Sequence, residues 1–273
     1  LFDFLLFLIF TLLFLCIFIC LIGPVYQTFP VVWEQVVFTM VSLCRDFGNS
    51  SESAIAYLWY GILLCGSLES IDLGYQFGEL GLRILEKFEN RNIQAKFNNA
   101  FYGAVFPWKR DIKAALKPLQ ENINLALGVG EIEYASYSTL NYSWLSLASG
   151  KPLESLNEEL IDIIELNQKL QQDFQVITNQ LCRQFVLNLL DSDSEVTQLN
   201  GEACNEDEII SRMMNSHNMH FMVYYYIPKT MICYLFKDFY TAYTIIQETA
   251  KHQDSGKGLH LWIQHNFYQS LTY

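Results

Sequence analysis

The 273-residue chain has few basic side chains. It carries 17 lysine and arginine residues against 29 aspartate and glutamate residues, a formal net charge of −12, and it contains no basic run. A general nucleic-acid-binding protein needs a basic face that displaces counterions from phosphate groups. The composition therefore excludes that class, and we expect no nucleic acid among the partners.

The motifs of nucleotide and calcium sites are also missing. Gly128 and Gly130 are followed by no third glycine and leave a predicted helix, so they do not form a dinucleotide fingerprint. Residues 254–258 lack the upstream glycine, the following Ser or Thr and the preceding strand of a P-loop. Asp191 and Asp193 alternate, but the glycine and final glutamate of a calcium loop are out of place. We predict no cofactor, no cofactor-binding residue and no small-molecule ligand.

No metal or catalytic constellation stands out. His217 and His220 lie three residues apart, with Cys204 and Cys233 elsewhere, and this spacing does not bring four zinc ligands together. A row of carboxylates is predicted to form a solvated helix face, because an acid–base pair needs a cleft and a charged partner. These carboxylates are Glu154, Glu158, Glu159, Asp162 and Glu165. We therefore predict no metal ligand and no catalytic residue, and we expect this chain not to be an enzyme.

The cysteines are odd in number and irregularly spaced. Most of them fall within apolar helical patterns, which favours small buried side chains in a reducing compartment. Cys16 and Cys20 share one helix face, but no further ligand lies near them. The seven are Cys16, Cys20, Cys44, Cys65, Cys182, Cys204 and Cys233.

The N-terminal segment, residues 1–23, is almost free of charge. No charged residue occurs between Asp3 and Glu34, and the segment is apolar on every side. About 20 apolar residues can span a bilayer as a helix, so both a membrane span and a buried first helix stay open. Proline and glycine punctuate helices, so Gly23-Pro24 is predicted to end this one. The chain begins at Leu1 without a methionine, and we expect it to be a fragment of a longer protein.

A helical pattern recurs along the chain. Apolar residues in 72–88 follow the spacing i, i+4, i+7, i+11, i+15, and 111–127 repeats it 39 residues later. A shorter copy starts at residue 239. The members are Leu73, Phe77, Leu80, Ile84 and Phe88, then Ile112, Leu116, Leu119, Ile123 and Leu127, then Phe239, Tyr243, Ile246 and Ala250. A repeat of about 40 residues is typical of a helical solenoid.

The predicted fold is all-α, a right-handed stack of antiparallel helix hairpins like that of tetratricopeptide repeats. It occupies residues 24–273, and a long acidic loop is expected at 191–207, where polar and turn-forming residues replace the helical pattern. Prolines at 118 and 228 are predicted to kink their helices.

The hairpin of 53–66 and 72–88 carries the most specific local predictions. Ser51 is a plausible N-cap. Gly61 is interpreted as a close contact between helices, and Gly66 as a C-terminal cap.

Residues 235–239, with Ala242, look like the corner of a tetratricopeptide repeat, although Phe236 replaces the usual glycine. Three longer stretches, 47–88, 130–156 and 231–243, together resemble the helical-repeat region of very large bacterial signalling proteins. In that family a serine/threonine kinase domain and an AAA-type ATPase module precede the repeats, and a GAF domain and a histidine kinase follow them. The resemblance covers roughly residues 24–273. None of the family's catalytic motifs lies in this chain.

The resemblance implies a non-catalytic scaffold segment of a multidomain signal-transduction kinase. Its expected role is to link the ATPase and sensor modules and to mediate protein–protein contacts, with those modules or other proteins as partners. The expected location is cytoplasmic, or membrane-associated if residues 1–23 span. One alternative is a membrane-anchored helical-repeat adaptor with a single N-terminal transmembrane helix. A weaker rival is an enzyme with a pocket among Trp59, Tyr60, Trp108 and Trp144.

Overall fold

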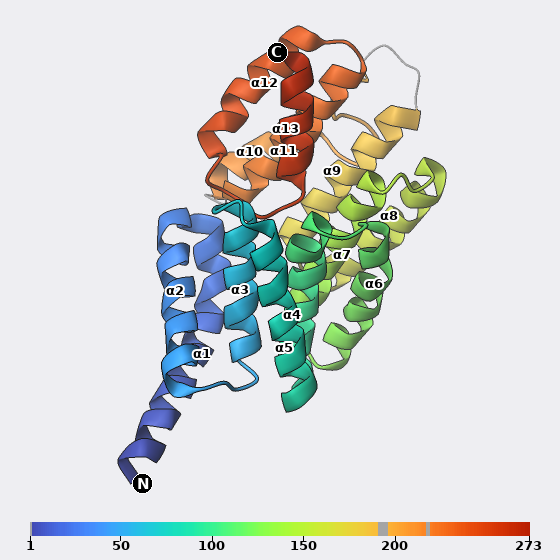
Figure 1. Ribbon diagram of the computed structural model, residues 1–273. Helices are drawn as coiled ribbons and strands as arrows, with labels where there is room; N and C mark the ends of the chain where they lie inside the picture. The colour runs from blue at the N-terminus through green and yellow to red at the C-terminus, as the bar shows by residue number, and fades with distance from the viewer. Residues whose placement is uncertain (1, 191–195, 217–218) are drawn as a thin grey trace.

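The computed structural model describes residues 2–190, 196–216 and 219–273, with side chains from residue 12 onward except at residues 30, 213–216 and 219. Every regular element in these ranges is a helix, and none is a strand (Figure 1). The prediction of an all-α class is confirmed.

Six helices form a connected inner set. Along the chain, each helix of this set packs against the next one: α1 against α3, α3 against α5, α5 against α7, α7 against α9, and α9 against α11. The chain then brings α11 back against α1, so the first and last inner helices also touch. The bounds are Phe2–Thr28 (α1), Ser53–Gly66 (α3), Arg91–Ala100 (α5), Ile132–Ala148 (α7), Asp173–Leu190 (α9) and Met219–Leu235 (α11).

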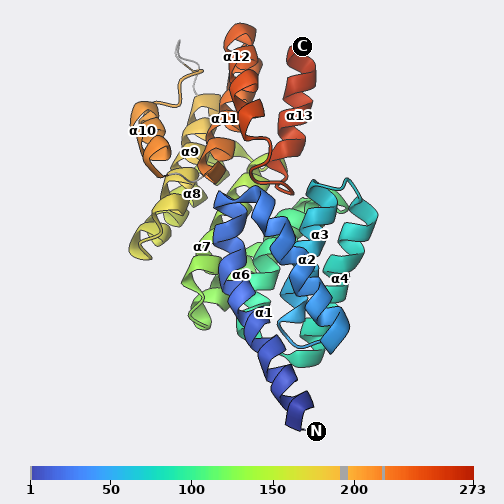
Figure 2. The ribbon, with the colours of Figure 1, turned by 90° about the vertical axis from the view of Figure 1, so that its left-hand side faces the viewer.

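The outer helices pack against the inner helices beside them in sequence (Figures 1 and 2). They are Pro30–Phe47 (α2), Ile71–Phe88 (α4), Lys113–Gly128 (α6), Leu153–Lys169 (α8) and Phe239–Thr249 (α12). The remaining helices are Glu206–Ser216 (α10) and Leu261–Thr272 (α13), and α13 packs against both α11 and α12. A π-turn at Phe101–Val105 and 3-10 turns at Phe106–Trp108 and Ala250–His252 complete the structure.

The outer helices bury equivalent positions at a constant interval. The first buried residue on the inward face of α2, α4, α6 and α8 advances by 41 each time: Trp33, Gly74, Ala115 and Leu156. The last does the same: Cys44, Leu85, Ala126 and Asn167. The left-handed residue after each of these helices keeps this interval too, at Gly48, Glu89, Gly130 and Gln171, with φ of 92°, 46°, 79° and 57°.

The inward face of α4 differs from the predicted one. Leu73 and Phe88 are 41% and 39% exposed. The buried residues of this helix include three glycines, Gly74, Gly78 and Gly81, together with Ile84 and Leu85. A side-chain carbon added at Gly61 of α3 would lie 2.7 Å from the Gly74 carbonyl oxygen, so the two helices meet backbone to backbone. Hydrophobic periodicity missed this face because glycine contributes closeness of approach instead of apolar area. The predicted close contact at Gly61 is confirmed.

Helix α1 continues to Thr28, so the prediction that Gly23-Pro24 ends it is wrong. A proline removes one backbone hydrogen bond and crowds the preceding turn. Burial of Tyr26 beyond the proline offsets this cost, since its ring packs between Trp33, Trp59 and His220. The Thr28 hydroxyl also donates a 2.8 Å hydrogen bond to the Pro24 carbonyl.

Only one side of the described part of α1 is buried. The buried residues are Leu15, Ile19, Ile22 and Tyr26, and Leu13, Phe14, Ile17 and Leu21 are between 43% and 53% exposed. In the part of the chain that the structure describes, no helix combines the length and apolarity needed to cross a bilayer. The side chains of residues 1–11, on which the membrane interpretation also depends, lie outside the described residues.

Two predicted caps of α3 are wrong. The residue before the helix is Glu52, and the Ser51 hydroxyl donates to the Glu52 carboxylate instead of capping a backbone N–H. Gly66 does not take a left-handed conformation, and the left-handed residue of that turn is Glu69. Gly66 is needed for a different reason, because an added side-chain carbon there would clash with the backbone of Gly258.

The acidic loop is shorter than predicted, because α10 begins at Glu206. Residues 191–195 lie outside the described residues. The Glu206 carboxylate is buried, lies 2.5 Å from the Lys229 ammonium and accepts a 2.7 Å hydrogen bond from the Tyr225 hydroxyl. The loop is tied to α9, since the Asn188 amide donates to the Val196 carbonyl at 2.8 Å. A polar sequence thus supplies buried, compensated contacts here instead of a solvated loop.

The remaining predictions concern the cysteines, the two prolines within helices and the carboxylates of α8. Cys44, Cys65, Cys182 and Cys233 are buried as expected, Cys204 is half-buried, and Cys16 and Cys20 are exposed on α1. Helices α6 and α11 run through Pro118 and Pro228. The predicted carboxylate face of α8 is exposed except at Glu159, which pairs with Lys151 at 2.5 Å and accepts a hydrogen bond from the Tyr142 hydroxyl.

Candidate binding cavity

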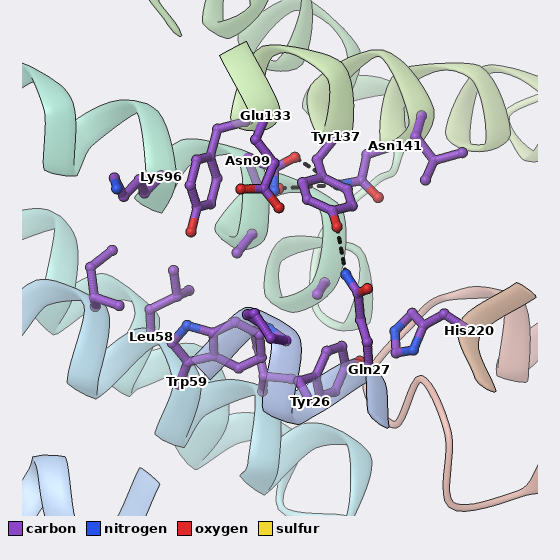
Figure 3. A pocket seen from close by; sticks show the side chains of 18 of the residues that line it. Tyr26, Gln27, Leu58, Trp59, Lys96, Asn99, Glu133, Tyr137, Asn141 and His220 are labelled. Atoms are coloured by element: carbon purple, nitrogen blue, oxygen red, sulfur yellow. Dashed lines mark hydrogen bonds between the residues drawn. The ribbon is translucent and has the colours of Figure 1, made fainter. Parts of the chain in front are cut away.

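A cavity of about 320 Å³ lies among the inner helices. Its walls come from α1, α3, α5, α7 and α11, with single contributions from α9 and from the segment after α12. In Figure 3, Glu133 and Tyr137 of α7 face Tyr26 and Trp59 of α1 and α3 across the space. Helices separated by up to 200 positions in sequence therefore share one cavity.

The floor of the cavity is aromatic. The ring of Tyr26 lies edge-on to Trp59 at 5.0 Å between centroids and edge-on to His220 at 4.7 Å. Such edge-to-face packing is the favoured arrangement of aromatic rings. Burial raises the pKa of Tyr26 well above its ordinary value, and its hydroxyl donates a 2.6 Å hydrogen bond to the Lys257 carbonyl. The floor is thus rigid and uncharged at neutral pH.

A polar bridge crosses the cavity from α1 to α7. The Gln27 side-chain amide donates a 2.5 Å hydrogen bond to the Tyr137 hydroxyl, and Glu133 lies on the same helix as Tyr137, one turn before it (Figure 3). Burial is the main reason that the pKa of Tyr137 rises to about 12; the Gln27 amide opposes the rise and the Glu133 carboxylate adds to it. Tyr137 is therefore a neutral phenol at pH 7, and Glu133 presents an exposed carboxylate at the cavity.

A second charged pair lies at the α5 side. The Lys96 ammonium is 3.2 Å from the Glu131 carboxylate, and both side chains are 20% exposed. The same ammonium sits over the Tyr134 ring, 5.1 Å from its centroid. An ammonium ion over a ring face is attracted by the ring quadrupole. The cavity wall thus already holds one cation by a carboxylate and an aromatic face.

Two amides meet between these charged groups. The Asn141 amide of α7 donates to the Asn99 side-chain oxygen of α5 at 3.0 Å. Gly103, in the π-turn that follows α5, makes room for Asn141, because a side-chain carbon there would clash with it. Asn99 is 8% exposed, and among the described residues its Nδ2 has no hydrogen-bond partner. Because Asn99 lines the cavity, this amide N–H can donate to a ligand or to water there.

The described lining carries a small negative charge. Burial lowers the pKa of His220 to about 4, so this ring is neutral at pH 7. Lys96 and Glu131 compensate each other, and Glu133 remains as the excess charge. The formal charge of the lining is therefore −1 at neutral pH.

The segment 253–260, which contains the glycines at 256 and 258, helps to enclose the cavity. The Trp108 indole donates a 2.9 Å hydrogen bond to the Gly258 carbonyl, and Lys257 lies 3.8 Å from the Glu34 carboxylate. Leu259 lines the cavity itself. Because Gly66 and Gly258 approach backbone to backbone, the C-terminal third is fastened to the N-terminal third at this point.

The aromatic residues of the enzyme rival do not form one pocket. Trp59 lines the cavity, whereas Tyr60 packs against Phe77, and Trp144 is buried beside Tyr224. Within the described ranges no three His, Cys, Asp or Glu side chains are grouped to hold a metal ion, and His217 lies outside those ranges. Whether the chain has an enzymatic activity stays a prediction.

Sequence analysis names Trp59 and His220 among the residues that line the cavity, but not as members of one site. It does not predict that Asn99, Glu133 or Tyr137 belongs to a site. One signal was available: Leu58, Asn99, Leu140 and Leu181 occupy successive inner helices at intervals of 41, and only Asn99 is polar.

No model of a known protein family, no curated protein and no solved structure matches the chain.

Proposed function

We propose that residues 24–273 form a right-handed, tetratricopeptide-like stack of helix hairpins with a period near 41. The constant interval between buried positions of the outer helices supports this, as does the left-handed residue that follows each of four of them. In such a stack each unit contacts its neighbours, and one set of helices lines an extended concave surface. The inner helices α1 to α11 supply that surface here.

The proposed function is that of a non-catalytic scaffold segment in a multidomain signal-transduction kinase, in the cytoplasm. The segment links the ATPase and sensor modules and binds proteins through its concave side. The observation that carries this proposal is the cavity, to which all six inner helices contribute. The three stretches of the family resemblance support it, because they fall on α3 and α4, on α7 and the start of α8, and on the α11–α12 corner.

The test is direct binding between the purified chain and the isolated ATPase, GAF and histidine kinase modules of the same signalling protein. Isothermal titration calorimetry should show binding to at least one module. Substituting Tyr137→Ala in the cavity should weaken it at least tenfold, because an aromatic anchor in a pocket dominates such interfaces. The matched control is Tyr240→Ala on α12, whose side chain is 83% exposed and far from the cavity lining.

Two results would contradict the proposal. One is the absence of binding to every module while circular dichroism shows a folded chain. The other is ATP hydrolysis or phosphoryl transfer above the blank by the purified chain alone.

A further inference from the structure

We propose that the cavity is a binding site for an organic cation, a guanidinium or ammonium group. The site deepens the proposed function, because an arginine or lysine side chain of a docking partner would carry such a group. Its volume, about 320 Å³, lies at the lower end of ligand sites, which range over roughly 300–1,000 Å³.

Charge is the first support. Glu133 is exposed at the cavity and carries the excess negative charge of the lining, while Glu131 neutralises Lys96. His220 is held neutral by burial and does not oppose a cation. The chain as a whole carries −12, which favours the approach of cations over anions. A phosphate or carboxylate ligand would meet Glu133 with no uncompensated cation to hold it.

The aromatic surface is the second support. Tyr26 and Trp59 form the aromatic floor of the cavity, and Tyr137 lies opposite them (Figure 3). Faces of tyrosine and tryptophan attract a guanidinium or ammonium group within about 6 Å of the ring centre. Within the same cavity, the Lys96 ammonium already lies over the Tyr134 ring and 3.2 Å from the Glu131 carboxylate. The incoming cation would make the same two kinds of contact, to an aromatic face and to a carboxylate, with Glu133 in place of Glu131.

The two amides are the third support. The Asn141 side-chain oxygen accepts no hydrogen bond from the described residues, and the Asn99 Nδ2 donates none. A guanidinium or ammonium N–H can donate to Asn141, and a peptide carbonyl beside the basic side chain can accept from Asn99. A purely apolar ligand would leave the 8% exposed Asn99 without a partner, which disfavours it.

The experiment titrates four probes into the full chain by calorimetry. They are the acetylated and amidated peptide Gly-Ser-Arg-Ser-Gly, the same peptide with lysine, the same peptide with uncharged citrulline, and agmatine as a free guanidinium. The arginine peptide should bind at least tenfold more tightly than the citrulline peptide, since a charge-assisted hydrogen bond is lost. This comparison uses the unmodified protein, so it does not depend on a variant's folding.

Variants then locate the site. Glu133→Gln should reduce the affinity for the arginine peptide about tenfold, whereas Glu154→Gln, the same change at an exposed carboxylate of α8, should leave it unchanged. Asn99→Ala should weaken the arginine peptide more than agmatine, because only the peptide offers a carbonyl.

The outcomes separate the cation site from the scaffold function. Two results would overturn the cation site. One is equal affinity for the arginine and citrulline peptides, and the other is no binding of any probe at 5 mM, roughly the weakest affinity of interest. Those results leave module binding untouched. Tighter binding of agmatine than of both basic peptides upholds the cation site and identifies a free small-molecule cation as its ligand, which counts against peptide docking at this cavity.

Discussion

Acid should destabilise this fold through its buried histidines, and the largest contributions come from His220 and His260. His220 and His260 are 5% and 7% exposed, and burial lowers the pKa of each to about 4 from an ordinary value of 6.5. In the unfolded chain both rings bind protons below pH 6.5, whereas in the folded chain they stay neutral until about pH 4. Their contribution to stability is thus complete above pH 6.5 and is lost as the pH falls from 6.5 to 4.

The magnitude follows from the two pKa values. Each ring costs about 2 kcal/mol of unfolding free energy between pH 7.5 and pH 5, and the two together about 4 kcal/mol. A domain is typically stable by only about 5–15 kcal/mol, so the loss is a large fraction of the total. His260 donates to the Trp144 carbonyl, which opposes the lowering, and its Nε2 has no partner among the described residues. Protonation at Nε2 would therefore place an unpaired charge in the core.

The assay is urea denaturation at pH 7.5, 6.5, 5.5 and 5.0, followed by circular dichroism. The variant His260→Leu should reduce the loss of unfolding free energy over this range by about 2 kcal/mol, whatever it does to stability at pH 7.5. His252→Gln is the control, because that ring is only half-buried and should change the slope less. If the unfolding free energies of the original chain and of His260→Leu fall in parallel as the pH is lowered, the reasoning is refuted.

Two further predictions concern packing. Gly61→Ala should cost about 1–3 kcal/mol in urea unfolding, because the new carbon would lie 2.7 Å from a backbone oxygen of α4, whereas Gly128→Ala, with no atom within 4 Å, should be neutral or stabilising. Lys229→Met should cost about 3–5 kcal/mol, because it strands the buried Glu206 carboxylate. Adding Glu206→Gln to that variant should restore part of the loss in thermal unfolding; an additive double variant would show that the pair is not coupled.

The helices themselves could be predicted from local patterns. The helix of residues 53–66 has the bounds that the sequence predicts, since apolar periodicity and flanking turn residues act over a few positions. The faces were harder to predict. On α4 the glycines face inward because α3 and the Phe101 ring come close, and that proximity is a property of the neighbours.

The cavity could not be predicted, because its residues come from helices far apart in sequence. Asn99 is a single polar residue on a helix face until α7 brings Asn141 to it. Glu133 is an ordinary exposed carboxylate until α1, α3 and α5 pack beside it and enclose the cavity that it lines. The role of residues 254–258 could not be predicted for the same reason, since only packing against Trp108 and Gly66 makes that segment part of the enclosure.

The sequence by itself determined that this chain is all-α, where most of its helices lie and that it carries a large negative charge, because these depend on neighbouring residues and on composition. The tertiary structure decided which face of each helix is buried, how α1 passes Pro24 and which side chains meet in the cavity. Those outcomes depend on which backbones can approach closely and on which buried polar groups find partners, and both are settled only when distant segments pack together.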